Sequence, residues 1–216
     1  MRILLASTNK GKVEELRRIL GEHGLEVAGL SGEMLTEEIE TGSTFEENAL
    51  LKARYYNSLT GHMVIADDSG LEVDALGGRP GIHSARYGGP AASDADRVMK
   101  LLDEMKDVAP ERRGARFVCA AAAVWGAGER VFVEEARGHI TRAPRGKEGF
   151  GYDPVFYYPP LGRTFAELSG EEKSRVSHRG LAFHRLAGWL KRNGLLDTIG
   201  PSDRINNPAS GTSASS

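Results

Sequence analysis

Short apolar runs alternate with segments of helical periodicity in the first third of the chain. The runs that predict buried strands are residues 2–6, 25–30 and 63–66. Between the first two, Val13, Leu16 and Leu20 recur at helical spacing. Asn9 precedes them and is a residue type that often caps a helix. Strands and helices that alternate in this way predict an α/β fold.

Three further helices are predicted where a Ser is followed three residues later by an acid, the spacing of a capping box. One is expected over residues 43–59, with Ser43 as its cap, and one over residues 93–108. The longest is expected over residues 169–193, with Gly194 as its stop. These helices would flank the sheet along the whole chain.

A hairpin makes the predicted sheet a mixed one. Residues 115–125 and 130–136 flank a Gly-Ala-Gly-Glu turn, and residues 155–158 predict one more short strand. We therefore expect one domain over residues 1–198, with a mixed, twisted sheet flanked by helices. Residues 199–216 are almost without apolar side chains, so we expect a disordered tail and assign it no function.

Composition and charge exclude several classes of protein. The 216 residues include 28 Lys and Arg against 30 Asp and Glu, which argues against a nucleic-acid-coating protein, because duplex binding needs a basic excess. The single Cys119 excludes a disulfide framework and a multi-cysteine zinc site. The apolar runs fall short of the ~18 residues of a membrane span, and the N-terminus lacks the pattern of a signal peptide. We expect a soluble, cytoplasmic protein without membrane or nucleic-acid partners.

The turn after the first strand is a candidate anion site. Its residues are Ser7, Thr8, Asn9, Lys10, Gly11 and Lys12. Hydroxyl groups, ammonium groups and the N–H groups of a helix N-terminus together favour a phosphate. A capped helix with solvated lysines explains the segment equally well, and the chain has no G-x-x-x-x-G-K-[ST] loop.

Two adjacent carboxylates follow the strand at residues 63–66. We expect this strand to end at Asp67 and Asp68, with one side chain toward a ligand and the other supporting the backbone, because consecutive strand residues point to opposite faces. Mg²⁺ suits such a site, since one or two carboxylates hold it and substrate phosphates complete its shell. Glu38 and Glu40, on an acidic loop, could add a ligand. The alternative is an Asx turn that ends the strand.

Further candidates lie on a helix and on a glycine-rich loop. Asn48 and Lys52 share a helix face, and a solvated lysine is the simpler interpretation of the second. Glycines on both sides of Phe150 leave its ring uncovered for stacking on a flat base, although a mobile loop tip has the same pattern.

The start of the long helix carries three more candidates. Lys173 opposes the helix dipole there, so we expect an anionic partner for it. His178 and Arg179 follow more than one turn later and can donate hydrogen bonds to carbonyl oxygens.

Taken in order, these motifs resemble a single family. They are residues 7–12, 41–49, 66–71, 77–87, 149–154 and 171–180. In this pattern the chain is similar to the inosine triphosphate pyrophosphatases, also called dITP/XTP pyrophosphatases, over residues 2–195. The resemblance implies an elongated α/β fold with two lobes and a central substrate cleft, and a homodimer. It also implies Mg²⁺-dependent hydrolysis of ITP, dITP and XTP to the monophosphate and pyrophosphate.

The resemblance also implies roles for the motif residues. Asp68 would be the proton acceptor and a metal ligand, with Glu40 as a second ligand. Residues 7–12 would hold the triphosphate, and Ser69 would contact the substrate. The rest of the pocket would be formed by Phe150, Gly151, Tyr152, Asp153, Lys173, His178 and Arg179. A 6-keto oxygen would accept from donors such as Arg179, whereas the 6-amino group of adenine would face them with a donor.

Three other functions fit parts of the same pattern. The first is a pyrophosphatase for pyrimidine or modified nucleotides, although Asn9 and Lys12 fit the purine group better. The second is a non-catalytic nucleotide-binding protein, which would gain nothing from the carboxylates of Asp67 and Asp68 without a metal. The third is a phosphotransferase, for which the sequence offers no second substrate site.

Overall fold

The computed structural model describes residues 3–7, 9–30, 39–126 and 128–195. Within them lies a seven-stranded sheet of order β2-β1-β3-β4-β5-β6-β7. Its strands are β1 (Ile3–Ala6), β2 (Val27–Gly29), β3 (Met63–Val73), β4 (Gly114–Trp125), β5 (Gly128–Ile140), β6 (Phe156–Tyr158) and β7 (Arg163–Thr164). Parallel pairing joins β1 to β2 and β3, and the other neighbours are antiparallel. The predicted α/β fold with a mixed sheet is therefore confirmed.

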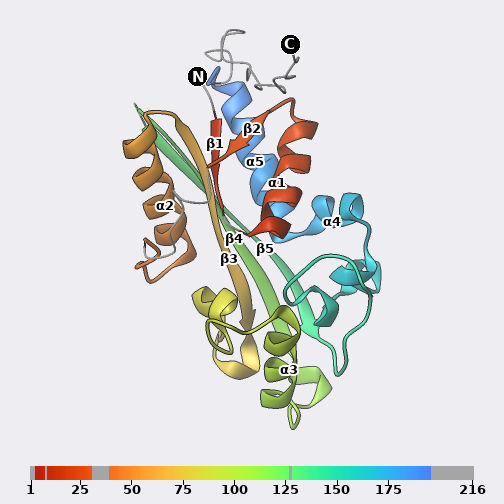
Figure 1. Cartoon of the computed structure of the whole chain (residues 1–216). Helices are drawn as coiled ribbons and strands as arrows, with labels where there is room; N and C mark the ends of the chain where they lie inside the picture. The colour runs from red at the N-terminus through yellow and green to blue at the C-terminus, as the bar shows by residue number, and fades with distance from the viewer. Residues whose placement is uncertain (1–2, 8, 31–38, 127, 196–216) are drawn as a thin grey trace, which may run out of the picture.

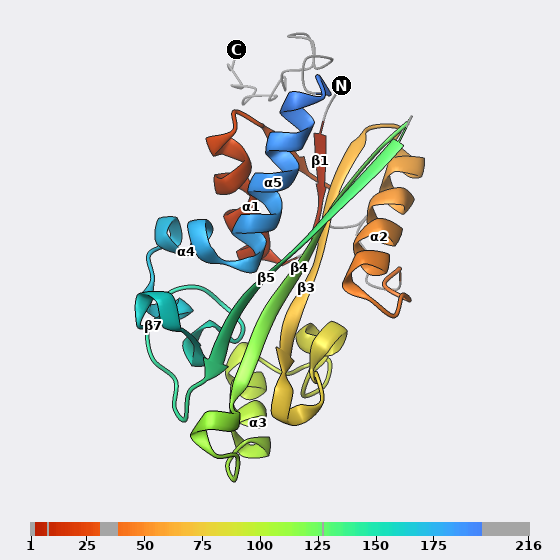
Figure 2. The ribbon, with the colours of Figure 1, turned by 180° about the vertical axis from the view of Figure 1, so that it is seen from behind.

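Helices cover both faces of the sheet. The α-helices are α1 (Lys10–Glu22), α2 (Phe45–Thr60), α3 (Asp94–Glu104), α4 (Gly170–Val176) and α5 (His178–Arg192). Short 3-10 helices are η2 (Asp74–Leu76), η3 (Gly81–Arg86), η4 (Pro110–Arg112), η5 (Asp153–Val155), η6 (Pro159–Leu161) and η7 (Phe165–Glu167). Figure 1 and Figure 2 show α1 and α5 on one face, α2 on the other, and α3 at the far end of the long strands. Strands β3, β4 and β5 connect the two ends and make the molecule elongated.

Each part of the molecule has its own hydrophobic core. On one face α1 and α5 bury side chains such as Leu16 and Phe183 against the sheet. On the opposite face α2 buries Tyr56. At the far end α3 contributes Leu101 to a third cluster that includes Phe156 of β6. The first two cores lie on the two faces of the sheet at the end covered by α1, α2 and α5. The third core forms a second lobe at the end covered by α3.

The middle of β4 carries very small side chains on both faces. Ala120, Ala121, Ala122 and Ala123 are consecutive and fully buried. Ala120 and Ala122 belong to the core under α2, whereas Ala121 and Ala123 belong to the core under α1 and α5. Because methyl groups form a thin layer, the helices on the two faces can approach each other closely at this level.

The strand predicted over residues 63–66, with a separate stretch of strand over residues 71–76, is one strand that continues through Asp67 to Val73. Only its parallel pairing ends at Asp67. Strand β1 stops at Ala6, opposite Ala66, and from Asp67 onward β4 is the only strand of the described residues that pairs with β3. The two carboxylates do not end the strand, because each finds partners on its own face of the sheet. The edge of β3 at Asp67–Ser69 is left open where β1 stops.

The cap of α2 lies one residue later than predicted. The Thr44 hydroxyl accepts from the Glu47 N–H at 3.1 Å, and the Glu47 carboxylate accepts from the Ser43 N–H at 2.7 Å. The predicted cap of α1 is confirmed, since Asn9 Oδ1 accepts from the Lys12 N–H at 3.0 Å. Both helices therefore start at residues that satisfy their first N–H groups.

The long helix predicted over residues 169–193 is two helices. They are separated by Ser177, which has an extended backbone and ends α4. The Ser177 hydroxyl caps α5 by accepting from the Gly180 N–H at 3.1 Å. The break places His178 and Arg179 in the first turn of α5, next to α4.

Gly180 is a position at which α5 approaches the backbone of α4 closely. A Cβ atom at this residue would overlap the carbonyl oxygen of Ser174. We expect Gly180→Ala to lower the free energy of unfolding by about 1–3 kcal/mol, a typical cost of overpacking, despite the better helix propensity of alanine. Urea denaturation measures the change. Gly188→Ala in the same helix is the control, because its Cβ meets only the flexible end of Arg192. Equal midpoints for the two variants would contradict the prediction.

Two regions discussed in the sequence lie outside the described residues. They are the first part of the acidic loop, residues 31–38, and the tail at residues 199–216. Glu38 belongs to the first of them.

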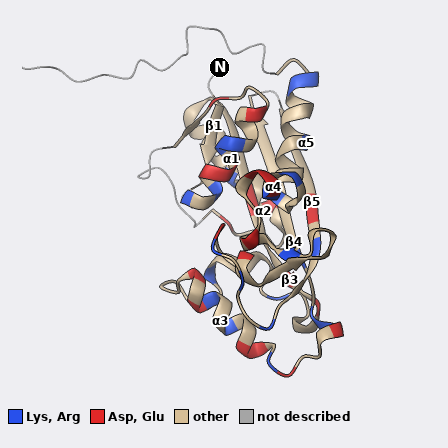
Figure 3. Cartoon of the chain, turned by 90° about the vertical axis from the view of Figure 1, so that its right-hand side faces the viewer, with Lys and Arg blue, Asp and Glu red and all other residues tan. Residues whose placement is uncertain are grey.

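Charges of both signs occupy the described helices. Figure 3 shows Lys and Arg interspersed with Asp and Glu on the helices seen in that view. Among the described residues, none of the helices has the length and apolarity needed to cross a membrane.

Candidate active site

Strand β3 directs its adjacent carboxylates to opposite faces of the sheet. Asp67 faces α1 and α5, where it contacts Lys12 and Arg179. Asp68 faces α2, where it contacts Asn48. Both carboxylates are buried. The two faces meet at the open edge of β3, and the candidate site is built around this edge.

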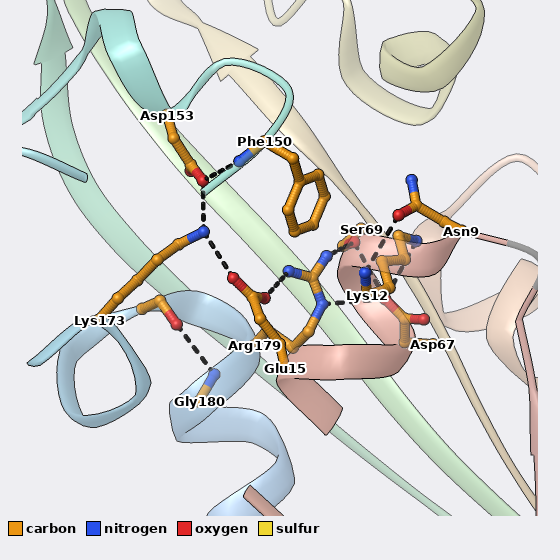
Figure 4. Close-up of polar contacts among 11 residues, drawn as sticks. Asn9, Lys12, Glu15, Asp67, Ser69, Phe150, Asp153, Lys173, Arg179 and Gly180 are labelled. Atoms are coloured by element: carbon orange, nitrogen blue, oxygen red, sulfur yellow. Dashed lines mark hydrogen bonds and ion pairs between the residues drawn. The ribbon is translucent and has the colours of Figure 1, made fainter. Parts of the chain in front are cut away.

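Arg179 is the centre of an ionic network between β3, α1 and α5 (Figure 4). Its guanidinium donates to Glu15 Oε2 at 2.6 Å, to Ser69 Oγ at 2.8 Å and, less closely, to Asp67 Oδ2 at 3.4 Å. The Lys12 ammonium lies 3.1 Å from the same Asp67 oxygen. The network therefore ties the N-terminal turn of α1 to the middle of β3.

Lys173 extends this network to the loop at residues 149–153. Its ammonium donates to Glu15 Oε1 at 2.6 Å and to Asp153 Oδ2. Asp153 also accepts from the Phe150 N–H at 2.9 Å. Burial raises the pKa of Asp153, and Lys173 offsets only part of that effect. The anionic partner expected for Lys173 is thus supplied by the protein itself.

Burial and ion pairing oppose each other in the remaining carboxyl groups of the network. Burial alone would raise the pKa of Glu15, but the charges of Arg179 and Lys173 outweigh it and hold that pKa below the usual range. The pKa of Asp67 is also depressed, because Lys12 and Arg179 outweigh its burial. Both carboxylates are therefore charged at neutral pH and compensate the buried cations.

A cavity of about 250 Å³ lies beside the network, between α1, α3, α5 and the loop. Most of the residues predicted to bind substrate line it, namely Asn9, Lys12, Ser69, Phe150, Gly151, Tyr152, Asp153, Lys173, His178 and Arg179. Ser7, Lys10 and Gly11 do not line it, and Thr8 lies outside the described residues. Asp94 and Arg97 of α3 form part of its wall, which no sequence motif indicated.

The Phe150 ring is less exposed than the flanking glycines led us to expect, although it lines the cavity. It is half-buried, and its centroid lies 5.0 Å from Lys173 Nζ and 5.3 Å from Arg179 Cζ. The next residue, Gly151, donates its N–H to Asp94 Oδ2 at 2.7 Å. The ring therefore stands over two cations in a loop that is anchored to α3.

His178 is a neutral imidazole in the cavity wall. Its ring stacks on Phe117 with centroids 4.5 Å apart. Burial lowers the pKa of His178, and the charges of Arg179 and Lys173 lower it further. Within the described chain, Nδ1 is buried without a hydrogen-bond partner. Because a neutral imidazole has one donor and one acceptor nitrogen, His178 can pair with either kind of group.

Asn48 holds Asp68 on the α2 side of the sheet. Its Nδ2 donates to Asp68 Oδ2 at 3.0 Å, and its Oδ1 accepts from the Gly42 N–H at 2.7 Å. Burial raises the pKa of Asp68; the charge of Lys12 opposes this shift and that of Glu40 reinforces it. A carboxylate with a raised pKa is a stronger proton acceptor than an ordinary one.

Lys52 is buried, so the solvated lysine expected from the sequence is wrong. Its ammonium contacts Glu40, which also lies 3.8 Å from Arg86. Burial lowers the pKa of Lys52, but the charge of Glu40 contributes to a net increase. Since Lys52 and Asn48 lie on the same face of α2, one helix brings both an amide and a cation toward Asp68.

Asp68 and Glu40 are the carboxylates that this side of the site offers to a metal ion. Across the described ranges there is no group of three or more His, Cys, Asp or Glu residues that could hold one. Mg²⁺ often takes only one or two carboxylates and completes its shell with water and phosphate oxygens. The chemistry of Asp68 and Glu40, whose charges act on each other, fits that ion.

Sequence reasoning missed Glu15 as part of the site, and it named Asp67 without its ionic partners. A signal for Glu15 was present, because it lies three residues after Lys12 and four before Ile19, on the buried face of α1. A charge on that face needs a buried partner. The partners of Asp67 had no local signal, since Arg179 is 112 residues away.

Comparisons with known proteins give a consistent result. A profile of the Ham1 family matches residues 3–189. The chain is 51% identical to a dITP/XTP pyrophosphatase of Frankia alni, over 88% of this chain and 98% of that protein. It is 50% identical to one of Geobacillus kaustophilus, over 85% and 91% respectively.

Two solved structures resemble the fold closely. The Staphylococcus aureus Ham1 protein superposes with a TM-score of 0.79 at 41% identity, covering 89% of this chain and all 100% of that one. The nucleoside-triphosphatase / dITP/XTP pyrophosphatase of Mycobacterium abscessus superposes with a TM-score of 0.69 at 47% identity, covering 86% and 97%.

Proposed function

The chain belongs to the Ham1 family, and on that premise we propose that it is a dITP/XTP pyrophosphatase. Such a hydrolase splits dITP, XTP and ITP into the nucleoside monophosphate and pyrophosphate, and so removes deaminated purines from the nucleotide pool. One observation in this chain carries the proposal. The buried Asp68, whose pKa is raised, lies at the open edge of β3 and directly precedes Ser69, which lines a cavity together with Lys12, Lys173 and Arg179.

Asp68 is the proposed proton acceptor for the attacking water. Its hydrogen bond from Asn48 fixes the orientation of the carboxylate, and its raised pKa favours proton uptake. Displacement at the α-phosphorus requires an activated water in line with the leaving group, without a covalent intermediate. The pyrophosphate leaves as the oxygen of that water bonds to phosphorus.

Lys12 and Lys52 are the cations proposed to neutralise the triphosphate. Both act electrostatically on Asp68, Lys12 from α1 and Lys52 from α2. The N-terminus of α1, capped by Asn9, adds N–H groups and a favourable dipole for an anion. We assign the phosphates to the edge of β3 between these two helices.

Mg²⁺ is the proposed cofactor, with Asp68 and Glu40 as the ligands from the protein. When bound, it neutralises charge that develops on the phosphate oxygens. Lys52 contacts Glu40 and thus competes with a cation for the same carboxylate.

The purine base is assigned to the cavity between the ionic network and α3. Phe150 offers a ring for stacking, and His178 offers a ring nitrogen without a partner among the described residues. Arg179 retains N–H groups beyond those that bind Glu15, Asp67 and Ser69. A 6-keto oxygen can accept from these donors, whereas each mismatch with adenine costs about 1–3 kcal/mol.

The value of kcat/KM is expected to fall in mild acid. The proton acceptor must be ionised, and the pKa of Asp68 is raised above 3.8. The acid limb of the pH profile of kcat/KM should therefore lie above pH 3.8, at a higher pH than the limb that an ordinary aspartate would produce. The pKa values of Asp67 and Glu15 are lowered, so these groups keep their charge as Asp68 titrates. Steady-state rates between pH 4 and pH 8 measure the limb, and a flat profile would contradict the assignment.

Pyrophosphate release tests the function itself. We expect fast release from ITP, dITP and XTP with Mg²⁺, slow release from ATP, GTP and dTTP, and none after chelation with EDTA. Release mainly from dTTP would retain the mechanism but overturn the purine pocket. Tight binding without release would instead favour a nucleotide-binding protein, and activity that persists in EDTA would overturn the metal assignment.

The homodimer and the cytoplasmic location belong to the same proposal. Both are supported by the resemblance to the inosine triphosphate pyrophosphatases. Sedimentation equilibrium of the purified protein tests the first, since a monomer at micromolar concentration would overturn it. Cell fractionation tests the second.

A further inference from the structure

Gly11 lies against the ring of Phe150 although it does not line the cavity. A Cβ atom built on Gly11 would lie 2.6 Å from Cδ1 and 2.9 Å from Cγ of Phe150. Ordinary contacts of a Cβ begin at 3.4 Å. The ring therefore occupies space that any other residue type at position 11 would fill with its own side chain.

Two buried cations also lie close to the ring. Lys173 Nζ and Arg179 Cζ lie 5.0 Å and 5.3 Å from its centroid. The Phe150 N–H is bound to Asp153, and Asp153 in turn is bound to Lys173. Figure 4 shows the ring projecting from the loop toward the guanidinium of Arg179. A ring that lies against Gly11 and close to two buried cations cannot move without changing these contacts.

We propose that Gly11 is a positioning residue for the base. The lack of a side chain at residue 11 sets how closely Phe150 approaches α1, and the ring in turn sets where the purine stacks. This inference rests on the proposed function, since it requires a base in the cavity. It assigns Gly11 a role in base recognition in place of the phosphate contact that its motif implied.

Alanine at position 11 tests this role alone, because the helical backbone conformation of Gly11 is one that alanine can adopt. Gly11 is the second residue of α1 and lies outside the set of glycines with positive φ. Alanine favours a helix more than glycine does, so α1 itself should not suffer. The added methyl group acts on the Phe150 ring, which must move because real Cβ atoms essentially never show contacts below 3.0 Å.

Steady-state kinetics with dITP test the proposal. Gly11→Ala should raise KM at least tenfold with less than a threefold change in kcat, because stacking on one aromatic ring accounts for about that much binding. Gly21→Ala is the matched control: it lies in the same helix, and its Cβ would have no neighbour within 4 Å. Equal KM values for the two variants would overturn the proposal.

Inhibition by inorganic tripolyphosphate distinguishes an effect on the Phe150 ring from an effect on phosphate binding. This anion has no base, so Gly11→Ala should leave its inhibition constant unchanged. If that constant rises as much as KM does, Gly11 acts on the phosphates and the proposal fails.

A double variant provides the last control. In a Phe150→Leu background, Gly11→Ala should raise KM less than twofold, because the ring that it displaces is gone. A full tenfold rise in that background would also overturn the inference. Wild-type protein that releases no pyrophosphate from dITP would instead refute the proposed function, so the two failures are distinguishable.

Discussion

Replacing Asp68 by asparagine is expected to lower kcat for dITP by about a thousandfold, the size of effect typical of a general base. The change should not unfold the protein, because the amide oxygen of the new side chain can still accept from Asn48. The raised pKa of Asp68 means that its negative charge opposes folding. The Tm of Asp68→Asn should therefore equal or exceed that of the wild type. Pyrophosphate release and thermal denaturation of the same sample measure the two effects.

Glu72→Gln is the matched control for this substitution. Glu72 lies on the same strand and, four residues further on, on the same face as Asp68, but it pairs with Arg116. Its loss should leave kcat within a factor of about two, since it contacts no part of the site. If Asp68→Asn retains near-normal turnover, another group must accept the proton.

Replacing Glu15 by glutamine is expected to lower the free energy of unfolding by about 3–5 kcal/mol, because it leaves Lys173 and Arg179 buried with fewer negative partners. The lowered pKa of Glu15 means that its charge stabilises the folded state. That contribution is full above the ordinary carboxyl pKa of 4.5 and is lost as the pH falls through the lower pKa of the folded state. Urea denaturation at pH 7 and at pH 3 measures both the loss and its pH dependence.

Glu14→Gln provides the comparison for Glu15. Glu14 is the preceding residue on α1 and is exposed, so removing its charge should change stability by less than about 0.5 kcal/mol. The difference between wild type and Glu15→Gln should narrow at the lower pH. An equal loss at both pH values would show that the charge of Glu15 is not what stabilises the fold.

Local signals in the sequence were enough for most elements of the fold. The start of α1 was predicted from Asn9 and the apolar spacing behind it, and the hairpin of β4 and β5 from a glycine turn. The errors arose where the decisive contact is distant. Residues 169–193 have helical periodicity throughout, but the chain breaks at Ser177, and α5 then packs closely on α4 at Gly180. Two adjacent aspartates favour the end of a strand unless each has a partner elsewhere.

The candidate site depended on distant contacts even more strongly. Residue types and local patterns indicated Lys12, Asp68 and Phe150 as candidates, and a family resemblance then assigned their roles. The sequence could not indicate that Lys52 is buried against Glu40, because the loop that carries Glu40 has no periodic pattern. Nor could it show that the cations of the pocket are paired before any substrate binds, since Glu15 comes from α1 and reaches α4 and α5 across the fold.

The row of alanines in β4 acts as a spacer for the whole active centre. Residues of this row pair directly with Asp67 and Asp68, with Ala121 opposite the first and Ala120 opposite the second. The strand backbone, with one layer of methyl groups on each face, thus separates the helix that carries Asn48 from the helix that carries Arg179. A larger side chain in the row would push these two helices apart. The spacing between the proposed phosphate and base subsites consequently depends on alanines that do not line the cavity assigned to the base.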